Sequence, residues 1–221
     1  EAVMAMASRS LRTGRWGALG SALALLLASA ELRADVPRPE HPRPEAYRAN
    51  WMNLNGPWQF EIDEQGDGEA RGLTHGHDLP QTIVVPFCPE SQLSGLGLGN
   101  TKYFKNVWYR RMVQLPEGMK GQRLRLHLGA VDYQTWVYVN GRLAGTHFGG
   151  SAPFACEITD LVEDGENELV VRVFDDLRSG LQPGGKQAYD QSEGCVYTRT
   201  TGIWQTVWLE AVGASYVENL S

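Results

Sequence analysis

Strict alternation of polar and apolar side chains is the feature that most restricts the fold of this chain. The clearest case is Arg123–Leu128, which reads Arg-Leu-Arg-Leu-His-Leu. A period of two places one set of side chains on each face of a strand, so this segment predicts a β-strand with one face on the core. Asn140-Gly141 separates the strand candidates at residues 135–139 and 142–146. Asn-Gly favours the type I′ turn that joins antiparallel strands, so we expect a hairpin here.

Strand signals recur along most of the chain. Nine segments are bounded by Gly, Pro, Asn or Asp, and they are residues 56–62, 82–85, 107–115, 123–128, 135–139, 142–146, 154–158, 168–174 and 203–212. Outside residues 1–30, no segment repeats apolar residues at the period of a helix. A single helical turn is expected at residues 159–162. About nine short antiparallel strands without long helices predict an all-β jelly-roll sandwich.

Residues 1–30 have the composition of a secretory signal peptide. Three arginines precede an apolar run at residues 18–28, and an Ala-Ser-Ala site ends at Ala30. A membrane-spanning helix is the alternative, but it needs about 20 apolar residues and this run is shorter. We therefore expect a secreted or periplasmic protein, with cleavage after Ala30 or Ala34.

A Pro-rich opening segment follows at residues 31–50. Four of its prolines lie between Val36 and Pro44. Proline fixes the backbone φ angle and lacks an N–H donor, so this stretch cannot form a helix or an inner strand. We expect an extended connection into the sandwich.

Composition and spacing argue against several kinds of partner. The chain has 20 Lys and Arg against 26 Asp and Glu, which is a formal net charge of −6. Such a chain lacks the basic surface that binds nucleic acid or an anionic membrane. No Cys-x-x-Cys motif and no His pair at metal spacing occurs, so neither a metal nor another cofactor is expected. His75 and His77 are assigned to a solvated turn.

Three cysteines leave one thiol over in an exported protein. Cys156 lies in a strand candidate and is assigned to the core as a small hydrophobic residue. Cys88 and Cys195 lie in loop-like sequence. They either form a disulfide or remain free, and the sequence leaves both alternatives open.

Residues 175–202 interrupt the regular spacing of the strands. This stretch has almost no aliphatic residues but contains tyrosines, arginines, threonines and amides. Long loops without secondary structure are usually functional or disordered, and this composition argues against disorder. It is therefore a candidate functional loop.

Five segments in series resemble one family. They are Trp51-Met52-Asn53-Leu54-Asn55-Gly56-Pro57-Trp58, Val84-Val85-Pro86-Phe87, Trp108-Tyr109-Arg110-Arg111, residues 131–141 with Val-Asp-Tyr and Val-Tyr-Val-Asn-Gly, and residues 201–210 with Thr-Gly-Ile-Trp-Gln-Thr-Val-Trp-Leu-Glu. They resemble the motifs of the sugar-binding domain of glycoside hydrolase family 2, which includes β-galactosidases, β-glucuronidases and β-mannosidases. The resemblance implies a galactose-binding-domain-like jelly roll at residues 51–213, with a linker starting at residues 214–221.

The resemblance also implies what a longer parent protein does. In this family an immunoglobulin-like domain and a barrel with two catalytic glutamates follow the sandwich. The parent would hydrolyse O-glycosyl bonds of β-linked saccharides, so its partners are carbohydrate and those downstream domains. Retaining hydrolysis needs two carboxylates about 5 Å apart. No residue of this chain is expected to be catalytic, and Glu210 is assigned to a solvated charge on an edge strand.

Two other classes of function stay open. One is a stand-alone secreted carbohydrate-binding module without catalysis. The other is a structural sandwich that docks a barrel and contacts no sugar. A reading frame that continues into a barrel would favour the enzyme.

The resemblance implies substrate-binding residues near the last strand. The β-galactosidase branch has a sugar-holding Asp in a Gly-Ile-Phe-Arg-Asp-Val segment, and this chain has Thr206 at that place. The remaining candidates for the rim of a sugar site are Arg199, Trp204, Gln205, Lys186 and Gln187. Indoles contact sugar C–H groups, and amides and guanidinium groups bond hydroxyls.

Several of these side chains have a second interpretation. Trp204 suits packing as well as sugar binding, whereas Trp208 is assigned to packing. Asp176 and its neighbour Asp175 could bind sugar or calcium, but two adjacent carboxylates are far from a complete calcium site. Asp132 is assigned to capping a turn rather than to sugar binding. Arg199, as a polar loop residue, is expected to support little of the core.

Overall fold

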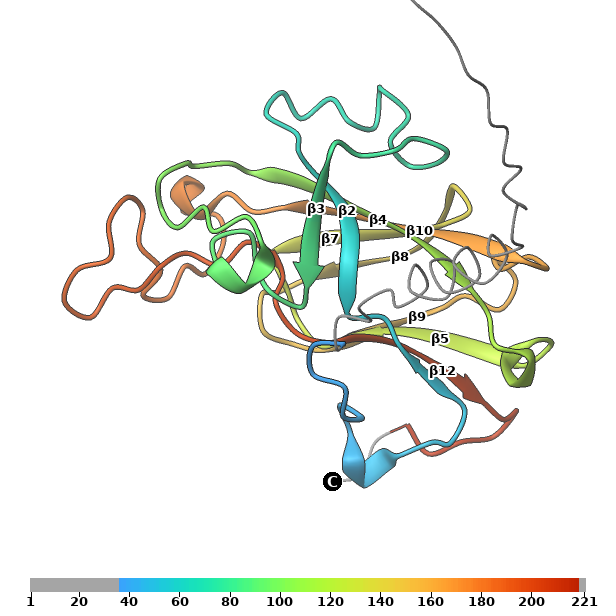
Figure 1. Ribbon diagram of the computed structural model, residues 1–221. Coiled ribbons are helices and arrows are strands. Elements are labelled where there is room, and N and C mark those ends of the chain that lie inside the picture. Colours follow the sequence, from blue (N-terminus) through green and yellow to red (C-terminus); the bar gives the residue numbers. More distant parts are fainter. Residues whose placement is uncertain (1–35, 219–221) are drawn as a thin grey trace, which may run out of the picture. The chain divides into compact units, whose positions relative to one another are not determined.

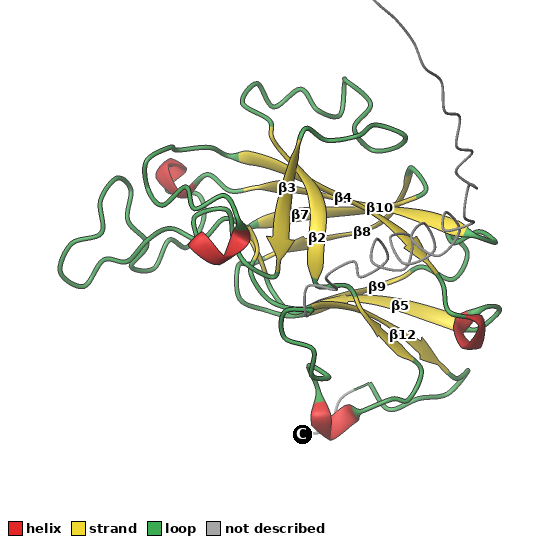
Figure 2. Cartoon of the chain, in the orientation of Figure 1, coloured by secondary structure: helices red, strands yellow, loops and turns green. Residues whose placement is uncertain are grey.

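The structure is a computed structural model that describes residues 36–218 (Figure 1). The expected signal peptide at residues 1–30 lies outside the described residues, as do residues 31–35 of the opening segment and residues 219–221. Strands dominate the described part, and the helices are four 3₁₀ turns of three residues each (Figure 2). They are η1 (Pro44–Ala46), η2 (Gln92–Ser94), η3 (Glu117–Met119) and η4 (Leu177–Ser179).

The strands form two antiparallel sheets and one short pair. The larger sheet has the order β3 (Gln81–Val85), β2 (Gly56–Ile62), β4 (Asn106–Gln114), β10 (Glu166–Phe174), β7 (Gln134–Val139) and β8 (Arg142–Phe148). The smaller sheet has the order β1 (Trp51–Asn53), β12 (Val207–Val212), β5 (Arg123–Leu128) and β9 (Phe154–Glu157). The short pair joins β6 (Val131–Asp132) to β11 (Gly202–Ile203). The expected all-β sandwich is confirmed.

The number of strands differs from the expected nine. The described residues contain twelve strands, because β1, β6 and β11 add to the expected set. Each has only two or three residues, which is too short for an alternating pattern to be visible in the sequence. The helical turn expected at residues 159–162 is a hydrogen-bonded turn instead, in which the N–H groups of Leu161 and Val162 both donate to Ile158 O (2.9 and 3.2 Å).

The core lies between the inner faces of the two sheets. Leu124, Leu126 and Leu128 of β5 are buried in it, as the alternation predicts. The outward residues of the same strand are not all solvated, since His127 is only 8% exposed. The opening segment covers this outer face, and the sequence pattern did not predict that.

The Asn140-Gly141 hairpin has the expected turn. Asn140 has φ of 48° and Gly141 has φ of 75°, which are the positive values that a type I′ turn requires. The Asn140 side chain also donates to Asn167 Oδ1 (2.8 Å) on β10 and to Leu161 O (3.0 Å). The turn therefore sets the pairing of β7 and β8 up to a bulge between Val137 and Tyr138, and the Asn140 side chain ties it to the neighbouring strand.

Replacing Leu126 by alanine tests the position of the core. This side chain is fully buried in β5, so its truncation should lower the free energy of unfolding by about 2–5 kcal/mol. Leu143 on the edge strand β8 is 54% exposed, and Leu143→Ala should change it by less than about 0.5 kcal/mol. Urea unfolding measures both variants, and equal losses would contradict this packing.

Candidate functional site

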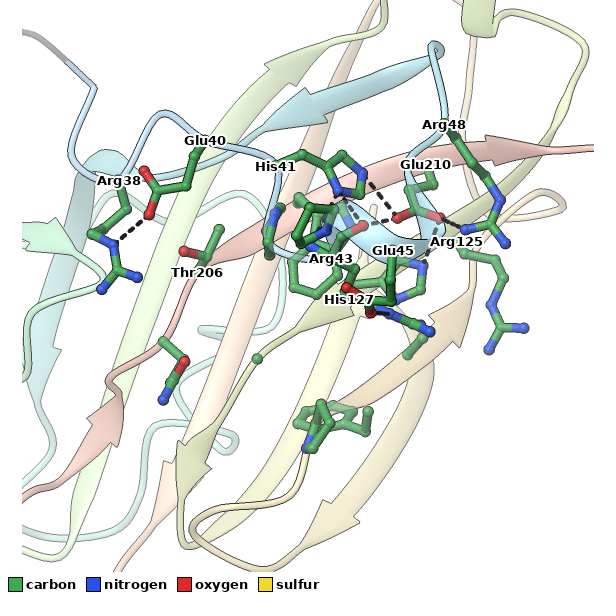
Figure 3. Close-up of a pocket in the computed structure, with 18 of the residues that line it drawn as sticks. Arg38, Glu40, His41, Arg43, Glu45, Arg48, Arg125, His127, Thr206 and Glu210 are labelled. Carbon is green, nitrogen blue, oxygen red and sulfur yellow. Dashed lines mark hydrogen bonds and ion pairs between the residues drawn. The ribbon is translucent and has the colours of Figure 1, made fainter. Parts of the chain in front are cut away.

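A pocket of about 790 Å³ lies on the outward face of β12, β5 and β9. We call it the outer pocket. Residues 38–48 of the opening segment and residues 216–218 form its other walls (Figure 3). Trp208 and His127 occupy paired positions of β12 and β5 and stack in parallel, with ring centroids 4.7 Å apart. This stack forms part of the pocket lining.

Glu210 is the central charge of the outer pocket. It is fully buried and accepts a hydrogen bond from Trp208 Nε1 (2.7 Å). Figure 3 shows His41, Arg48 and His127 around it: Arg48 is ion-paired with it, and the Nε2 atoms of His41 and His127 lie 3.5 and 3.6 Å from its oxygens. The assignment of Glu210 to a solvated edge strand is wrong, because β12 lies between β1 and β5. Trp208 is buried, as its assignment to packing requires.

Charges in this pocket perturb one another. Burial opposes the ionisation of Glu210, but the Trp208 indole N–H and the positive charges around it hold the pKa of Glu210 below its usual value. Burial lowers the pKa of His127 to about 4, against the raising effect of Glu210. The imidazole of His127 is therefore neutral at pH 7.

A second polar group joins the loops at one end of the sandwich. We call it the loop network, and its members are Glu90, Asp132, Asp175, Gln187, Arg199 and Thr201. Residues 86–104 and 175–202, green and orange in Figure 1, lie side by side there. Arg199 Nε donates to Glu90 Oε1 (3.1 Å), and its Nη2 donates to Lys102 O (2.5 Å).

Arg199 is fully buried, so the expectation that it supports little of the core is wrong. Its guanidinium carbon lies 4.9 Å from the ring centre of Tyr103 and 4.8 Å from that of Phe104. Its charge-matched partner Glu90 is also buried. The pair connects loops more than 100 residues apart in the sequence.

Asp132 and Asp175 are the acidic centre of the loop network. Asp132 Oδ2 accepts from Gln187 Nε2 (3.0 Å) rather than capping a turn, whereas its buried Oδ1 has no hydrogen-bond partner in the described part of the chain. Asp175 accepts from Gln182 Nε2 (2.6 Å) and Thr201 Oγ1 (2.9 Å). Burial raises the pKa of Asp132 to about 6. Burial and then the charge of Asp132 raise the pKa of Asp175 to about 7.

The six sequence-predicted site residues do not form one cluster in the structure. Arg199 and Gln187 belong to the loop network, where Gln187 Oε1 also accepts from Thr200 N (2.7 Å). Asp176 is half-buried, accepts from the Tyr103 hydroxyl (2.8 Å) and pairs with Lys105 Nζ (2.8 Å).

The other three predicted residues are more accessible. Lys186 is exposed, and Gln205 is exposed at the outer pocket. Trp204 is half-buried, and its Nε1 donates to Gly150 O (2.7 Å). Gly150 precedes Ser151, which lines the outer pocket, so Trp204 lies beside that pocket.

Sequence reasoning missed His41, Arg48 and His127 as pocket residues. A signal exists for His127, which takes an outward position in the alternation of β5. Nothing in the local sequence shows that the Pro-rich segment brings His41 and Arg48 over that strand.

The cysteines and histidines that could bind a metal form no metal site in the described part of the chain. All three thiols are free, so Cys88 and Cys195 form no disulfide, and Cys156 is buried as expected. His75 is mostly exposed and paired with Glu168. Within residues 36–218, no cluster of three or more His, Cys, Asp or Glu side chains could hold a metal ion. That same part of the chain has no helix with the length and apolar character to cross a membrane.

Comparison with known proteins gives consistent matches. The family model described as "Glycosyl hydrolases family 2, sugar binding domain" matches residues 51–211. A β-galactosidase of Thermoanaerobacter pseudethanolicus is 30% identical over 79% of this chain and 21% of its own length. A β-glucuronidase of Bacteroides fragilis is 34% identical over 59% of this chain and 17% of its own length.

A solved structure of a β-glucuronidase also matches this chain. A Lactobacillus rhamnosus β-glucuronidase superimposes with a TM-score of 0.61 and 27% identity, covering 76% of this chain and 30% of that one. The chain therefore spans 17–30% of the length of these relatives.

The raised pKa values of the loop network predict a pH dependence. A carboxyl whose pKa is higher in the folded protein stabilises it fully below its unfolded pKa, near 4, and loses that contribution as pH rises through the folded value. The shift of the Asp132 pKa from 3.8 to about 6 corresponds to roughly 3 kcal/mol at about 1.4 kcal/mol per unit. As pH rises from 4 to 8, the free energy of unfolding of Asp132→Asn should therefore increase by about that much relative to wild type.

Urea unfolding at the two pH values measures this difference. Comparing the variant with wild type cancels the groups that do not interact with Asp132, whereas Asp175 loses the raising effect of the Asp132 charge in the variant and contributes to the difference. Parallel pH profiles of the two proteins would show that Asp132 is not the group responsible.

The buried Arg199–Glu90 pair predicts a stability effect. Arg199→Ala leaves the Glu90 carboxylate buried without its cation, which should cost about 3–5 kcal/mol of unfolding free energy. Lys186→Ala, an exposed change in the same loop, should cost less than about 0.5 kcal/mol. Thermal and urea unfolding check both, and a wild-type midpoint for Arg199→Ala would refute this role.

Proposed function

Because the chain belongs to glycoside hydrolase family 2, we propose that it is the N-terminal sugar-binding and scaffold domain of a secreted β-glycosidase. The parent hydrolyses the O-glycosyl bond at the non-reducing end of a β-linked saccharide. A galactoside or a glucuronide is the proposed substrate, because the matched relatives are β-galactosidases and β-glucuronidases. The family match over residues 51–211 is the observation that carries this proposal.

The acidic residues of this domain are proposed to take no part in catalysis. Retaining hydrolysis needs a proton donor and a nucleophilic carboxylate about 5 Å apart at the scissile bond. Glu90, Asp132 and Asp175 are buried and engaged with neighbours inside the sandwich. As the family resemblance implies, the catalytic pair is proposed to lie in a barrel that follows an immunoglobulin-like domain in the parent.

The loop network and Trp204 are proposed to form one rim of the parent's substrate pocket. Arg199 supports this rim from within, because its buried ion pair fixes the loop that leads into Trp204. Trp204 and its neighbour Gln205, which follow this loop, are the accessible residues that would contact substrate. An indole face and a primary amide offer the contacts that a sugar ring and its hydroxyls need.

Export is proposed from the composition of residues 1–30. The parent would then work in the periplasm or outside the cell. Mass spectrometry of the protein recovered from the culture medium or periplasm would find a chain that begins after Ala30 or Ala34. An intact leader on active protein would contradict this proposal.

Kinetics of the full-length parent test the proposed function. The parent should release 4-nitrophenol from a β-galactoside or β-glucuronide, whereas this 221-residue chain should not exceed a blank. Trp204→Ala and Gln205→Ala in the parent should each lower kcat/KM about 10-fold, since each removes about 1.4 kcal/mol of transition-state binding.

Arg142→Ala, an exposed change on β8, is the matched control and should retain wild-type kcat/KM. Wild-type kinetics in both rim variants would assign these side chains to the scaffold. Turnover by the 221-residue chain that scales with protein through repurification would overturn the assignment of catalysis to a downstream barrel.

A further inference from the structure

The loop network holds three buried carboxyl groups but only one buried positive charge. Glu90, Asp132 and Asp175 are all buried, and so is the guanidinium of Arg199. Arg199 is ion-paired with Glu90 (3.1 Å). Within residues 36–218, neither aspartate has a Lys, Arg or His side chain at ion-pair distance. Ionising both aspartates would therefore leave two negative charges without a counter-ion inside the protein.

Neutral amide and hydroxyl groups donate hydrogen bonds to the two aspartates. Gln187 Nε2 donates to Asp132 Oδ2 (3.0 Å), while the buried Oδ1 of Asp132 has no partner in the described part of the chain. Gln182 Nε2 and Thr201 Oγ1 donate to Asp175 (2.6 and 2.9 Å). These few bonds replace the water that would surround an exposed carboxylate. Burial therefore favours the protonated form of both side chains.

All three donors belong to residues 176–201, which we call the polar loop. The two aspartates are fixed to the sandwich instead, because Asp132 ends β6 and Asp175 directly follows β10. Of the apolar side chains in the polar loop, only Leu177 and Ala188 are buried. A segment with few buried apolar contacts opens locally at a smaller free-energy cost than a core strand does. Weakening the bonds to the aspartates would therefore act first on this loop.

Other ionisable side chains surround the two aspartates, and they are Cys88, Glu90 and Tyr103 of residues 86–104, Tyr109 of β4, and Asp176 and Arg199 of the polar loop. Burial raises the pKa of Cys88 and of Tyr103 to about 12, and that of Tyr109 well above its usual value, so all three stay neutral up to pH 8. Burial opposes the ionisation of Asp176, but its ion pair with Lys105 holds its pKa below the usual value. Burial raises the pKa of Glu90, and its partner Arg199 opposes that rise.

We propose that Asp132 and Asp175 form a pH-sensitive switch, which holds the polar loop closed while both side chains are protonated and releases it when they ionise. The closed state is stabilised fully below the unfolded pKa, near 4, and this contribution is lost as pH rises through the folded values of about 6 and 7. Release lets water reach both carboxylates. As regulation the switch rests on the proposed function, because release lowers kcat/KM only if this loop borders the substrate pocket.

Hydrogen exchange of the 221-residue chain, followed by mass spectrometry at pH 5 and pH 8, tests the switch. Labelling times are adjusted for the intrinsic pH dependence of amide exchange. Peptides of the polar loop should then exchange at least about 10-fold faster at pH 8, which corresponds to about 1.4 kcal/mol of opening free energy. Peptides of β5 should change by less than about twofold, because core strands open at a higher free-energy cost.

Replacing both aspartates by asparagine removes the ionisation and keeps polar side chains of the same size. In Asp132→Asn/Asp175→Asn, the polar loop should exchange at the same adjusted rate at both pH values. Asp190→Asn is the matched control, since Asp190 is an exposed carboxyl of the same loop, and it should keep the wild-type pH dependence. Thermal unfolding verifies that each variant is folded. Asp132→Asn alone should reduce the pH effect, and it serves as the test if the double variant does not fold.

Three outcomes would overturn the switch: equal adjusted exchange of the polar loop at both pH values, an undiminished pH effect in the asparagine variants, or an equal change in β5. The last outcome would mean that the whole sandwich unfolds rather than the loop. The glycosidase proposal is judged separately by 4-nitrophenol release from the parent. Because hydrogen exchange needs neither substrate nor activity, failure of that proposal would leave the pH-dependent opening of the loop standing.

Discussion

The inner faces of the two sheets bury one continuous layer of side chains, and the outward positions of the same strands carry the polar groups of the outer pocket. In β12, Leu209 points into the core while Trp208 and Glu210 point outward. In β5, Leu126 and His127 divide in the same way. Because the strand period is two, core packing places these polar side chains in rows on the outer face.

Two ion pairs with buried carboxylates then tie long-range segments to that frame. Arg199 and Glu90 join two loops, and Arg48 and Glu210 join the opening segment to β12. Removing charges from water costs free energy that the attraction barely offsets, so such pairs add little net stability. Removing one partner, however, leaves a buried charge unpaired and lowers the free energy of unfolding. We infer that they select one arrangement of the loops, which a binding surface requires.

The parts of the fold that depend on neighbouring residues could be predicted from the sequence. The alternation of Arg123–Leu128 and the Asn140-Gly141 turn are local signals, and both predictions are confirmed. The burial of Arg199 depends on a glutamate 109 residues away, and no local pattern encodes that contact. Glu210 looked solvated for the same reason, since its cover comes from a Pro-rich segment far away in the chain. The residue types of the site could therefore be predicted from the sequence, but the burial of those residues could not.

The opening segment is also attached to the other end of the described chain. Arg43 Nη2 donates to Glu218 O (3.0 Å), and Arg48 Nη2 donates to Val217 O (2.5 Å). The short ladder between β1 and β12 runs beside these contacts. Tension applied at the two ends would thus stretch this surface strap before it reached the buried layer. We infer that these few surface bonds would yield under such a load while the core stayed folded.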